Sequence, residues 1–307
     1  MPTAAVVVSW EGGETTDRCI ASLAAQEAPP AEIIVVDNAS GAAERRRLST
    51  AYGRRPGVRL LLLGENRQFA GGLNAGATAA FAAGADRVLL LNNDTVLAPD
   101  ALRLLGDALD ATPDAGIAGP RIVDLARPAR VLSAGERHVL PLLCMPRTLL
   151  RHRPRGTAPF AVTGVMGSAM LVTRPCFEAV GGFMENIEVY YEEVDFCLSA
   201  RARGYTVIVA PAAVVWHDGL RGFAAGLTPW AAFLKARNPW LVMRRHARVG
   251  AWLAFVPSYP ALIGASVVLW MLRGRLDVVR ALVRGAAAGA VTVVGRAPAP
   301  VGAPRPG

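Results

Sequence analysis

Residues 32–40, EIIVVDNAS, decide the fold, because a short run of β-branched residues passes directly into polar side chains. A continuous apolar run of this length is typical of a strand that is buried on both faces of a sheet. Similar runs recur through the first 120 residues, and segments with helical spacing separate them. These runs are Ala4–Ser9, Val58–Leu63, Arg87–Asn92 and Ala115–Gly119. The repetition predicts an α/β fold with a mostly parallel sheet flanked by helices.

More helices and strands are predicted on either side of one long connection. Segments 17–26 and 73–83 carry apolar side chains at helical spacing. Residues 121–159 are rich in Pro and Arg and have no regular pattern, so we expect a long connection that is a candidate acceptor loop. Regular patterns then predict a strand over 164–173, a helix over 192–203, a strand over 205–210 and a helix over 229–245.

Residues 251–272 contain no charged side chain and are about long enough to cross a bilayer. Pro257 and Pro260 interrupt this stretch, which leaves a straight span, a kinked or re-entrant arrangement and an interfacial helix as alternatives. Residues 273–284 place arginines and aliphatic side chains on different helical faces, as in a basic amphipathic helix. A pair of helices packed into the core is the other interpretation.

The chain is predicted to have three parts, because 307 residues suit one large domain with an appendage. We expect an α/β domain over 1–245, a membrane-associating helical region over 246–296 and a disordered, Pro- and Gly-rich tail over 297–307. The hydrophobic content of 52% and the mean hydropathy of +0.32 are high for a soluble protein. They favour contact with a membrane.

The net charge of +9 fits an anionic membrane surface or a substrate that carries phosphate. The arginines cluster without the interleaved aromatic side chains that stack on bases, so we expect no nucleic-acid partner. The four cysteines are far apart and form no C-x-x-C pair, which indicates neither a zinc site nor a disulfide framework. The catalytic part is therefore expected in a reducing cytoplasm.

Polar residues at the ends of the predicted strands form the candidate site, since an open α/β sheet binds ligands there. Asp37 either accepts hydrogen bonds from a base or ribose or caps the following turn. The run 92–95, NNDT, either supplies oxygen ligands for Mg²⁺ or Mn²⁺ or forms an ordinary turn. Paired glycines in residues 66–76 open a helix, which favours phosphate and lets the backbone approach a ligand. Their spacing matches neither G-x-G-x-x-G nor a Walker loop.

Two further groups of titratable side chains lie later in the chain. Glu192, Glu193 and Asp195 begin a predicted helix, where acids compensate the helix dipole or where two adjacent acids supply a general base. His217 follows the strand-like run 214–216 and is either a buried structural residue or a metal ligand.

Taken together and in order, these segments resemble glycosyltransferase family 2, in particular its bacterial rhamnosyltransferase-like members. The resemblance covers residues 4–245 and rests on a series of short motifs. They are VVVSW (6–10), C-x-x-SL-x-x-Q (19–26), VVDNAS (35–40), NRQFAGGLNAG (66–76), LNND (91–94), G-x-x-ML (167–171), FE-x-VGGF (177–183), EEVDFC (192–197) and RN (237–238).

The resemblance implies a GT-A fold and gives roles to particular residues. Two residues are then candidate catalytic residues: Glu193, which would be the base, and the adjacent Glu192. Asp94 and His217 would ligate one Mg²⁺ or Mn²⁺ ion on the donor diphosphate. Arg237 would add positive charge near the diphosphate, or it would cap local structure together with its neighbour. The donor-binding residues are then Ser9, Trp10, Glu11, Asp37, Asn38, Asn66, Gly72, Asn74, Asn93, Asp94 and Arg237.

The implied activity is an inverting transfer of a sugar from a dTDP- or UDP-linked donor, with rhamnose as one candidate. The acceptor would be a cell-envelope glycan or one linked to polyprenyl diphosphate, and the enzyme would act at the cytoplasmic face of the cell membrane.

Some positions depart from the family pattern: Glu11 replaces Asn, Met184 replaces Asp, and Asn92 replaces the first acid of the Asp-x-Asp-type motif. A catalytically silent, membrane-attached scaffold of the same fold is the alternative.

Overall fold

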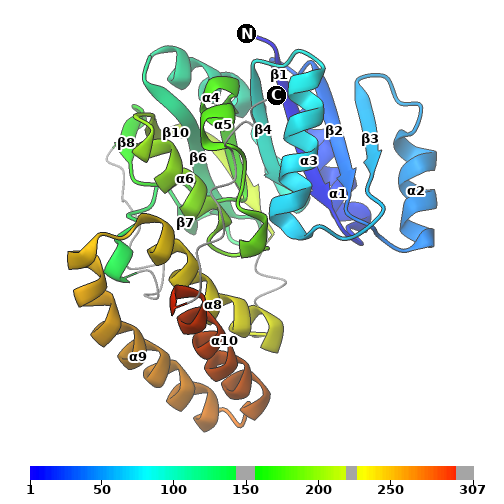
Figure 1. Cartoon of the computed structure of the whole chain (residues 1–307). Coiled ribbons are helices and arrows are strands. Elements are labelled where there is room, and N and C mark those ends of the chain that lie inside the picture. Colours follow the sequence, from blue (N-terminus) through cyan, green and yellow to red (C-terminus); the bar gives the residue numbers. More distant parts are fainter. Residues whose placement is uncertain (143–155, 219–226, 295–307) are drawn as a thin grey trace, which may run out of the picture.

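A ten-stranded sheet forms the centre of the chain, in the order β3-β2-β1-β4-β9-β6-β10-β5, with β7 beside β6 and β8 beside β10 (Figure 1). The structure is a computed structural model that describes residues 1–142, 156–218 and 227–294. The strands are β1 (Thr3–Ser9), β2 (Glu32–Asp37), β3 (Val58–Leu62), β4 (Arg87–Asn92), β5 (Thr95–Leu97), β6 (Ala115–Asp124), β7 (Val131–Ser133), β8 (Phe160–Val162), β9 (Ala169–Thr173) and β10 (Thr206–His217). The predicted α/β class is confirmed.

The first four strands are parallel, and their register brings several polar residues to one edge. Ser9 at the end of β1 is paired with Asp37 at the end of β2, and Val8 is paired with Asn92 at the end of β4. The sheet then becomes mixed, because β9 runs antiparallel between β4 and β6. Strand β10 is parallel to β6 and antiparallel to β5, with His217 opposite Thr95.

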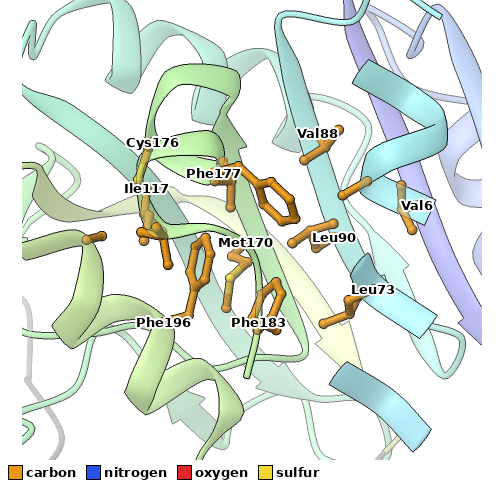
Figure 2. Packing of buried hydrophobic residues seen from close by; sticks show 14 of the residues in the cluster. Val6, Leu73, Val88, Leu90, Ile117, Met170, Cys176, Phe177, Phe183 and Phe196 are labelled. Atoms are coloured by element: carbon orange, nitrogen blue, oxygen red, sulfur yellow. The ribbon is translucent and has the colours of Figure 1, made fainter. Parts of the chain in front are cut away.

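Helices cover both faces of the sheet, which explains why the strands are continuously apolar. One core cluster contains alternate strand residues such as Val6 and Leu90 and packs under α3, α5 and α6; Figure 2 shows it around Phe177, Phe183 and Phe196. The other cluster lies under α1, α2 and α4. These helices are α1 (Gly13–Ala24), α2 (Ala42–Tyr52), α3 (Gln68–Ala82), α4 (Ala101–Asp110), α5 (Arg174–Val180) and α6 (Glu192–Ala202).

Helix α3 begins at Gln68, five residues before the predicted start, and its glycines pack against β1. A Cβ atom at Gly76 would lie 2.2 Å from Val6 Cγ1, and one at Gly72 would lie 2.7 Å from Val8 Cγ1. Both glycines are therefore needed for the close approach of helix and strand. The expected close approach of this backbone to a ligand stays a prediction.

Residues 121–159 are more regular than predicted. Strand β6 continues to Asp124, β7 follows, η1 (Leu140–Leu142) lies further along, and β8 begins directly after the stretch, at Phe160. Residues 143–155, which include Cys144 and one arginine cluster, lie outside the described residues, as does the predicted tail over 297–307. The role of the stretch as an acceptor loop stays a prediction.

Three C-terminal helices form a group below the sheet in Figure 1: α8 (Pro229–His246), α9 (Val249–Leu272) and α10 (Leu276–Val294). Helix α10 packs closely on α8, since a Cβ atom at Gly285 would lie 2.2 Å from Phe233 O. Helix α9 is continuous through Pro257 and Pro260. The predicted apolar helical appendage is confirmed, while the division into parts at residues 245 and 296 stays a prediction.

Candidate functional site

Asp37 is fully buried at the end of β2, and both of its carboxylate oxygens are engaged. Arg45 Nε donates to Oδ2 at 2.9 Å, and the backbone N–H of Ser40 donates to Oδ1 at 3.3 Å. The arginine neutralises the buried charge, and the Ser40 bond closes the turn before α2. The capping role that the sequence left open is thus present. Each oxygen keeps a second lone pair, so a bond to a ribose or base is compatible with this geometry.

Asn38 fixes the start of α3 beside the end of β2. Its Nδ2 donates to Gln68 O at 2.8 Å, and its Oδ1 accepts from the backbone N–H of Arg67 at 2.9 Å. Asn66 Oδ1 accepts from the backbone N–H of Gln68 at 2.8 Å. Gln68 has a φ of 57°, a left-handed conformation that these bonds hold in place. Asn38 and Asn66 therefore shape the predicted phosphate-binding turn.

The loop after β1 meets the loop after β2. The backbone N–H of Glu11 donates to Ser40 Oγ at 2.9 Å, and Glu11 Oε1 accepts from the backbone N–H of Gly41 at 2.5 Å. Trp10, between Ser9 and Glu11, is 60% exposed. The exposed indole is a flat aromatic surface beside this anchored residue, and its stacking on a nucleotide base stays a prediction.

A buried polar cluster joins β1 to the segment after β4. Ser9 Oγ lies 2.9 Å from Thr16 Oγ1, and Asn93 Nδ2 donates to the same Thr16 oxygen at 3.1 Å. A Cβ atom at Gly12 would lie 2.2 Å from both Asn93 Nδ2 and Thr16 Oγ1. Gly12 and Thr16 were not among the predicted site residues, because their importance depends on a contact 77 residues along the chain.

Asp94 and His217 lie together although 123 positions separate them. Strand pairing places His217 opposite Thr95, directly after Asp94. Asp94 Oδ1 and His217 Nε2 are 3.2 Å apart, and Asn92 Nδ2 lies 3.4 Å from the same imidazole nitrogen. The predicted pair of metal ligands is therefore brought together at the end of β4.

The donor set fits a hard divalent ion. Within the described residues, Asp94 Oδ1 and Asn92 Oδ1 are buried, and apart from the imidazole 3.2 Å from Asp94 Oδ1 neither atom has a hydrogen-bond partner. Octahedral ligands about 2.1 Å from an ion stand about 3 Å apart, close to the separation of Asp94 Oδ1 and His217 Nε2. No group of three or more His, Cys, Asp or Glu side chains able to hold a metal occurs in the described part of the chain. An ion here would take its remaining ligands from water and substrate oxygens.

Glu193 approaches the same edge through the segment before β9. The backbone N–H of Asn92 donates to Ser168 O at 3.0 Å. Gly167 directly precedes Ser168 in the chain. A Cβ atom at Gly167 would lie 3.1 Å from Glu193 Cβ. Glu192 and Glu193 are 4% and 3% exposed at the start of α6. The helix dipole favours acids at this position, and the Glu193 side chain packs against Gly167, whose neighbour Ser168 is bonded to the end of β4.

Arg237 and Asn238 on α8 clamp the segment that leads into Glu192. Asn238 Nδ2 lies within 3.0 Å of the backbone oxygens of residues 187, 189 and 190. Arg237 Nη1 donates to Glu188 Oε1 at 2.8 Å, and its Nε donates to Asn238 Oδ1 at 2.9 Å. The clamped residues Glu188, Tyr190 and Tyr191 all have positive φ. Arg237 therefore has the structural role that the sequence left as an alternative, and its contact with a diphosphate stays a prediction.

We expect Asn238→Ala to lower the transfer rate at least about tenfold and to destabilise the fold by about 1–3 kcal/mol, because buried carbonyl groups lose their donor. The strained segment would relax, and the two glutamates after it would move. Thermal unfolding and steady-state kinetics measure the two effects. Arg201→Ala, on the exposed side of α6, is the matched control and should change neither. An unchanged kcat in Asn238→Ala would show that the clamp does not position the glutamates.

Two other predicted features are used for packing. Asp195, the third acid of the run, is fully buried and pairs with Arg245 Nη1 and His246 Nε2, both at 2.8 Å, so it ties α6 to α8. Asn74 exchanges two hydrogen bonds with the backbone of Phe183, at 2.8 and 2.9 Å. It lines a cavity of about 1080 Å³ between α3, residues 181–186 and the end of α8. Its contact with a donor stays a prediction.

The described cysteines are buried, and Cys19 Sγ donates to Asn92 O at 3.6 Å and so packs beneath the site. Burial raises the pKa of Cys19 and of Cys176 to about 12, and it raises the pKa of Cys197 as well. Buried thiols of high pKa are poor nucleophiles and poor metal ligands. Burial, together with the charge of neighbouring Glu192, also raises the pKa of Tyr190, which therefore stays a neutral phenol.

Known proteins share this fold and this sequence pattern. The N-acetylglucosaminyl-diphospho-decaprenol L-rhamnosyltransferase of Mycobacterium tuberculosis is 30% identical over 290 residues, which cover 88% of this chain and 89% of the relative. The dTDP-rhamnosyl transferase RfbF of Shigella flexneri is 23% identical over 224 residues, which cover 70% and 71% of the two chains.

Solved structures support the predicted GT-A fold. GalNAc-T7 with UDP, GalNAc and Mn²⁺ superposes with a TM-score of 0.60 at 14% identity, over 84% of this chain and 54% of the other. Residues 1–349 of S. aureus TarS in complex with UDP give 0.55 at 12% identity, over 83% and 70%. The family model described as glycosyltransferase like family 2 matches residues 2–249. The match covers most of the chain, so the protein belongs to the glycosyltransferase like family 2.

Proposed function

We propose that this protein is an inverting, metal-dependent glycosyltransferase. It would move a sugar from a nucleoside-diphosphate-sugar donor to a lipid-linked glycan. The observation that carries the proposal is the Asp94–His217 pair, 3.2 Å apart, on the edge that also holds Ser9 and Asp37. Glu193 lies against the segment before β9 at the end of the same strand β4. The proposed metal ligands, the proposed nucleotide-binding side chains and a buried carboxylate thus lie along the edge where an open α/β sheet binds its ligands.

The nucleotide end of the donor would bind the loops after β1 and β2. Trp10 is exposed and would stack on the base, while Asp37 would accept a hydrogen bond from the base or ribose through its remaining lone pairs. The turn shaped by Asn38 and Asn66 would place the start of α3 near the diphosphate. Ser9, Glu11, Gly72 and Asn93 would support these contacts by holding the loops and the helix in place.

The diphosphate would be held at the end of β4. Asp94 and His217 would hold one Mg²⁺ or Mn²⁺ ion, and the Oδ1 atom of Asn92 lies beside them. When bound, the ion would neutralise the charge that develops on the leaving diphosphate. One carboxylate and one imidazole supply a single negative charge, so tight metal binding is expected only together with the donor diphosphate.

Glu193 would accept the proton of the acceptor hydroxyl. As the oxygen of that hydroxyl bonds to the anomeric carbon, the bond from this carbon to the diphosphate oxygen breaks on the opposite face, and the configuration inverts. The electron pair leaves with the nucleoside diphosphate, and the proton remains on the carboxylate. Glu192, the adjacent acid in the first turn of α6, is the second candidate for this role.

The names of the relatives suggest which substrates to test first. One relative is named for transfer of L-rhamnose to N-acetylglucosaminyl-diphospho-decaprenol and another for dTDP-rhamnose. We therefore propose dTDP-rhamnose as donor, with UDP-sugars as the second choice, and a polyprenyl-diphosphate-linked N-acetylglucosamine as acceptor. Such acceptors are amphiphilic, which favours a site of action at a membrane surface, and we propose the cytoplasmic face of the cell membrane.

A panel of nucleotide sugars, screened by thermal shift with and without Mn²⁺, tests the donor site. The correct donor at 100 times its Kd adds about 2.7 kcal/mol to the free energy of unfolding, and the addition should require Mn²⁺. The nucleoside monophosphate is the control, because it lacks the diphosphate and should show little dependence on the metal. If no nucleotide sugar gives a shift that depends on Mn²⁺, the proposed donor site is wrong.

A further inference from the structure

Helix α9 exposes a wide apolar face that nothing in the described part of the chain covers. Val249, Leu253 and Leu272 are 77%, 73% and 83% exposed, and Val256, Val268 and Met271 are also exposed. No charged side chain occurs between residues 249 and 272. The helix is long and apolar enough to cross a membrane by length and composition. An apolar face of this size is unusual on a surface that meets water.

The opposite face of α9 is attached to the protein along its length. The packed side chains are Trp252, Phe255, Tyr259, Ile263, Val267 and Trp270. Tyr259 Oη donates to Ala236 O at 2.5 Å, which bonds the middle of α9 to α8. Figure 1 shows α9 along the outside of the group that it forms with α8 and α10. With 24 residues, the helix is about 36 Å long. It has a packed face and a bare face, and the bare face is the one that carries the exposed apolar side chains named above.

This lateral attachment distinguishes between the possible arrangements in a membrane. Helix α8 carries Arg237, whose guanidinium is bonded to Glu188, and so is fixed to the α/β domain. If α9 crossed a bilayer, α8 and the exposed arginines Arg280 and Arg284 of α10 would enter the hydrocarbon beside it. Charged groups are excluded from that region. A helix that lies flat on the bilayer avoids this conflict, since only its bare face leaves water.

We propose that α9 is an in-plane anchor, which inserts its bare face into one leaflet of an anionic bilayer. Both of its ends are basic, with exposed Arg248 before the helix and exposed Arg273 after it. The Arg273 guanidinium lies over the Trp270 ring, 4.9 Å from the centroid. Arginine and tryptophan together are typical of the level of the lipid headgroups. This inference does not depend on sugar transfer.

Flotation of the full chain with vesicles measures the interaction. We expect binding to phosphatidylcholine vesicles that contain phosphatidylglycerol, and weaker binding to phosphatidylcholine alone. The double variant Leu253→Glu/Val268→Glu should lower partitioning at least about tenfold, because it places charges on the bare face. Leu62→Glu, at a residue 46% exposed on β3, is the matched control and should bind as the unmodified chain does. Equal binding by the double variant, or equal loss in the control, would overturn the proposal.

Spin labels on the bare face test the in-plane orientation. Cysteines replace Ala254, Ala261 and Ala265 one at a time in a Cys144→Ser background, and the other native thiols are buried. An in-plane helix places all three labels at the same shallow depth in anionic vesicles. A maximum of depth at Ala261 would show a helix that crosses the bilayer, and labels open to water would show no insertion. Either result would overturn the proposal.

Discussion

Glu193→Gln is expected to lower the rate of sugar transfer by about 10²- to 10⁴-fold, the range that a positioned general base contributes. Glutamine has nearly the same shape but cannot accept the proton of the acceptor hydroxyl. The side chain is buried against Gly167, so the substitution keeps the packing at the end of β4. Donor binding, measured by thermal shift with Mn²⁺, should be unchanged, because Glu193 is assigned to the acceptor side.

Glu192→Gln is the matched control, since the two glutamates are adjacent and equally buried. It removes one negative charge from the same turn of α6 but leaves the proposed base in place. We expect it to retain most of the activity. If Glu193→Gln transfers sugar at an unimpaired rate, Glu193 is not the base. If Glu192→Gln is the inactive variant, the roles of the two residues are reversed.

Asp94→Asn is the second substitution with a large expected effect. Mn²⁺ would lose its single carboxylate ligand, and we expect its apparent affinity in the presence of donor to fall by more than about 100-fold. His217→Ala should act in the same direction, because the imidazole Nε2 lies 3.2 Å from Asp94 Oδ1. Mn²⁺ titration followed by electron paramagnetic resonance measures binding directly and independently of turnover.

Asp107→Asn controls for the loss of one negative charge. Asp107 is exposed on α4 and pairs with Arg103, so this variant should bind Mn²⁺ normally. Unchanged Mn²⁺ binding in both Asp94→Asn and His217→Ala would remove the assignment of the metal to this pair. Loss in only one of them would leave that residue as the ligand and require another partner for the ion.

The parallel strands could be predicted because burial on both faces leaves an uninterrupted aliphatic signal. The predicted run 32–37 is β2 itself, and 87–92 is β4. The length of β10 could not be predicted in the same way. Its apolar run is interrupted by Pro211, which cannot donate to a ladder, so the prediction ended at Ala210. The structure accommodates the proline with a register shift between Ala210 and Val214, and the strand continues to His217.

In the candidate site, too, residues marked by a local sequence pattern could be predicted, and residues whose role depends on contacts with distant parts of the chain could not. Asp37 and Asp94 could be found because each follows a strand, and parallel strands bring their ends to one edge. The contacts of Arg45 and Asn238 depend on how elements pack, and no local pattern marks them. Arg45 neutralises Asp37 from the next helix, and Asn238 reaches carbonyls 48 to 51 positions earlier in the chain. Sequence alone left Arg237 with two roles for the same reason.

Transfer itself is the most direct test. The full chain is incubated with dTDP-rhamnose, Mn²⁺ and a polyprenyl-diphosphate-linked N-acetylglucosamine in detergent, and the lipid product is analysed by mass spectrometry and by NMR of its anomeric centre. We predict one added sugar, with the anomeric configuration opposite to that of the donor, and no product from Glu193→Gln above background. If neither dTDP-rhamnose nor any UDP-sugar of the panel gives product or free nucleoside diphosphate, the proposed transfer reaction is contradicted.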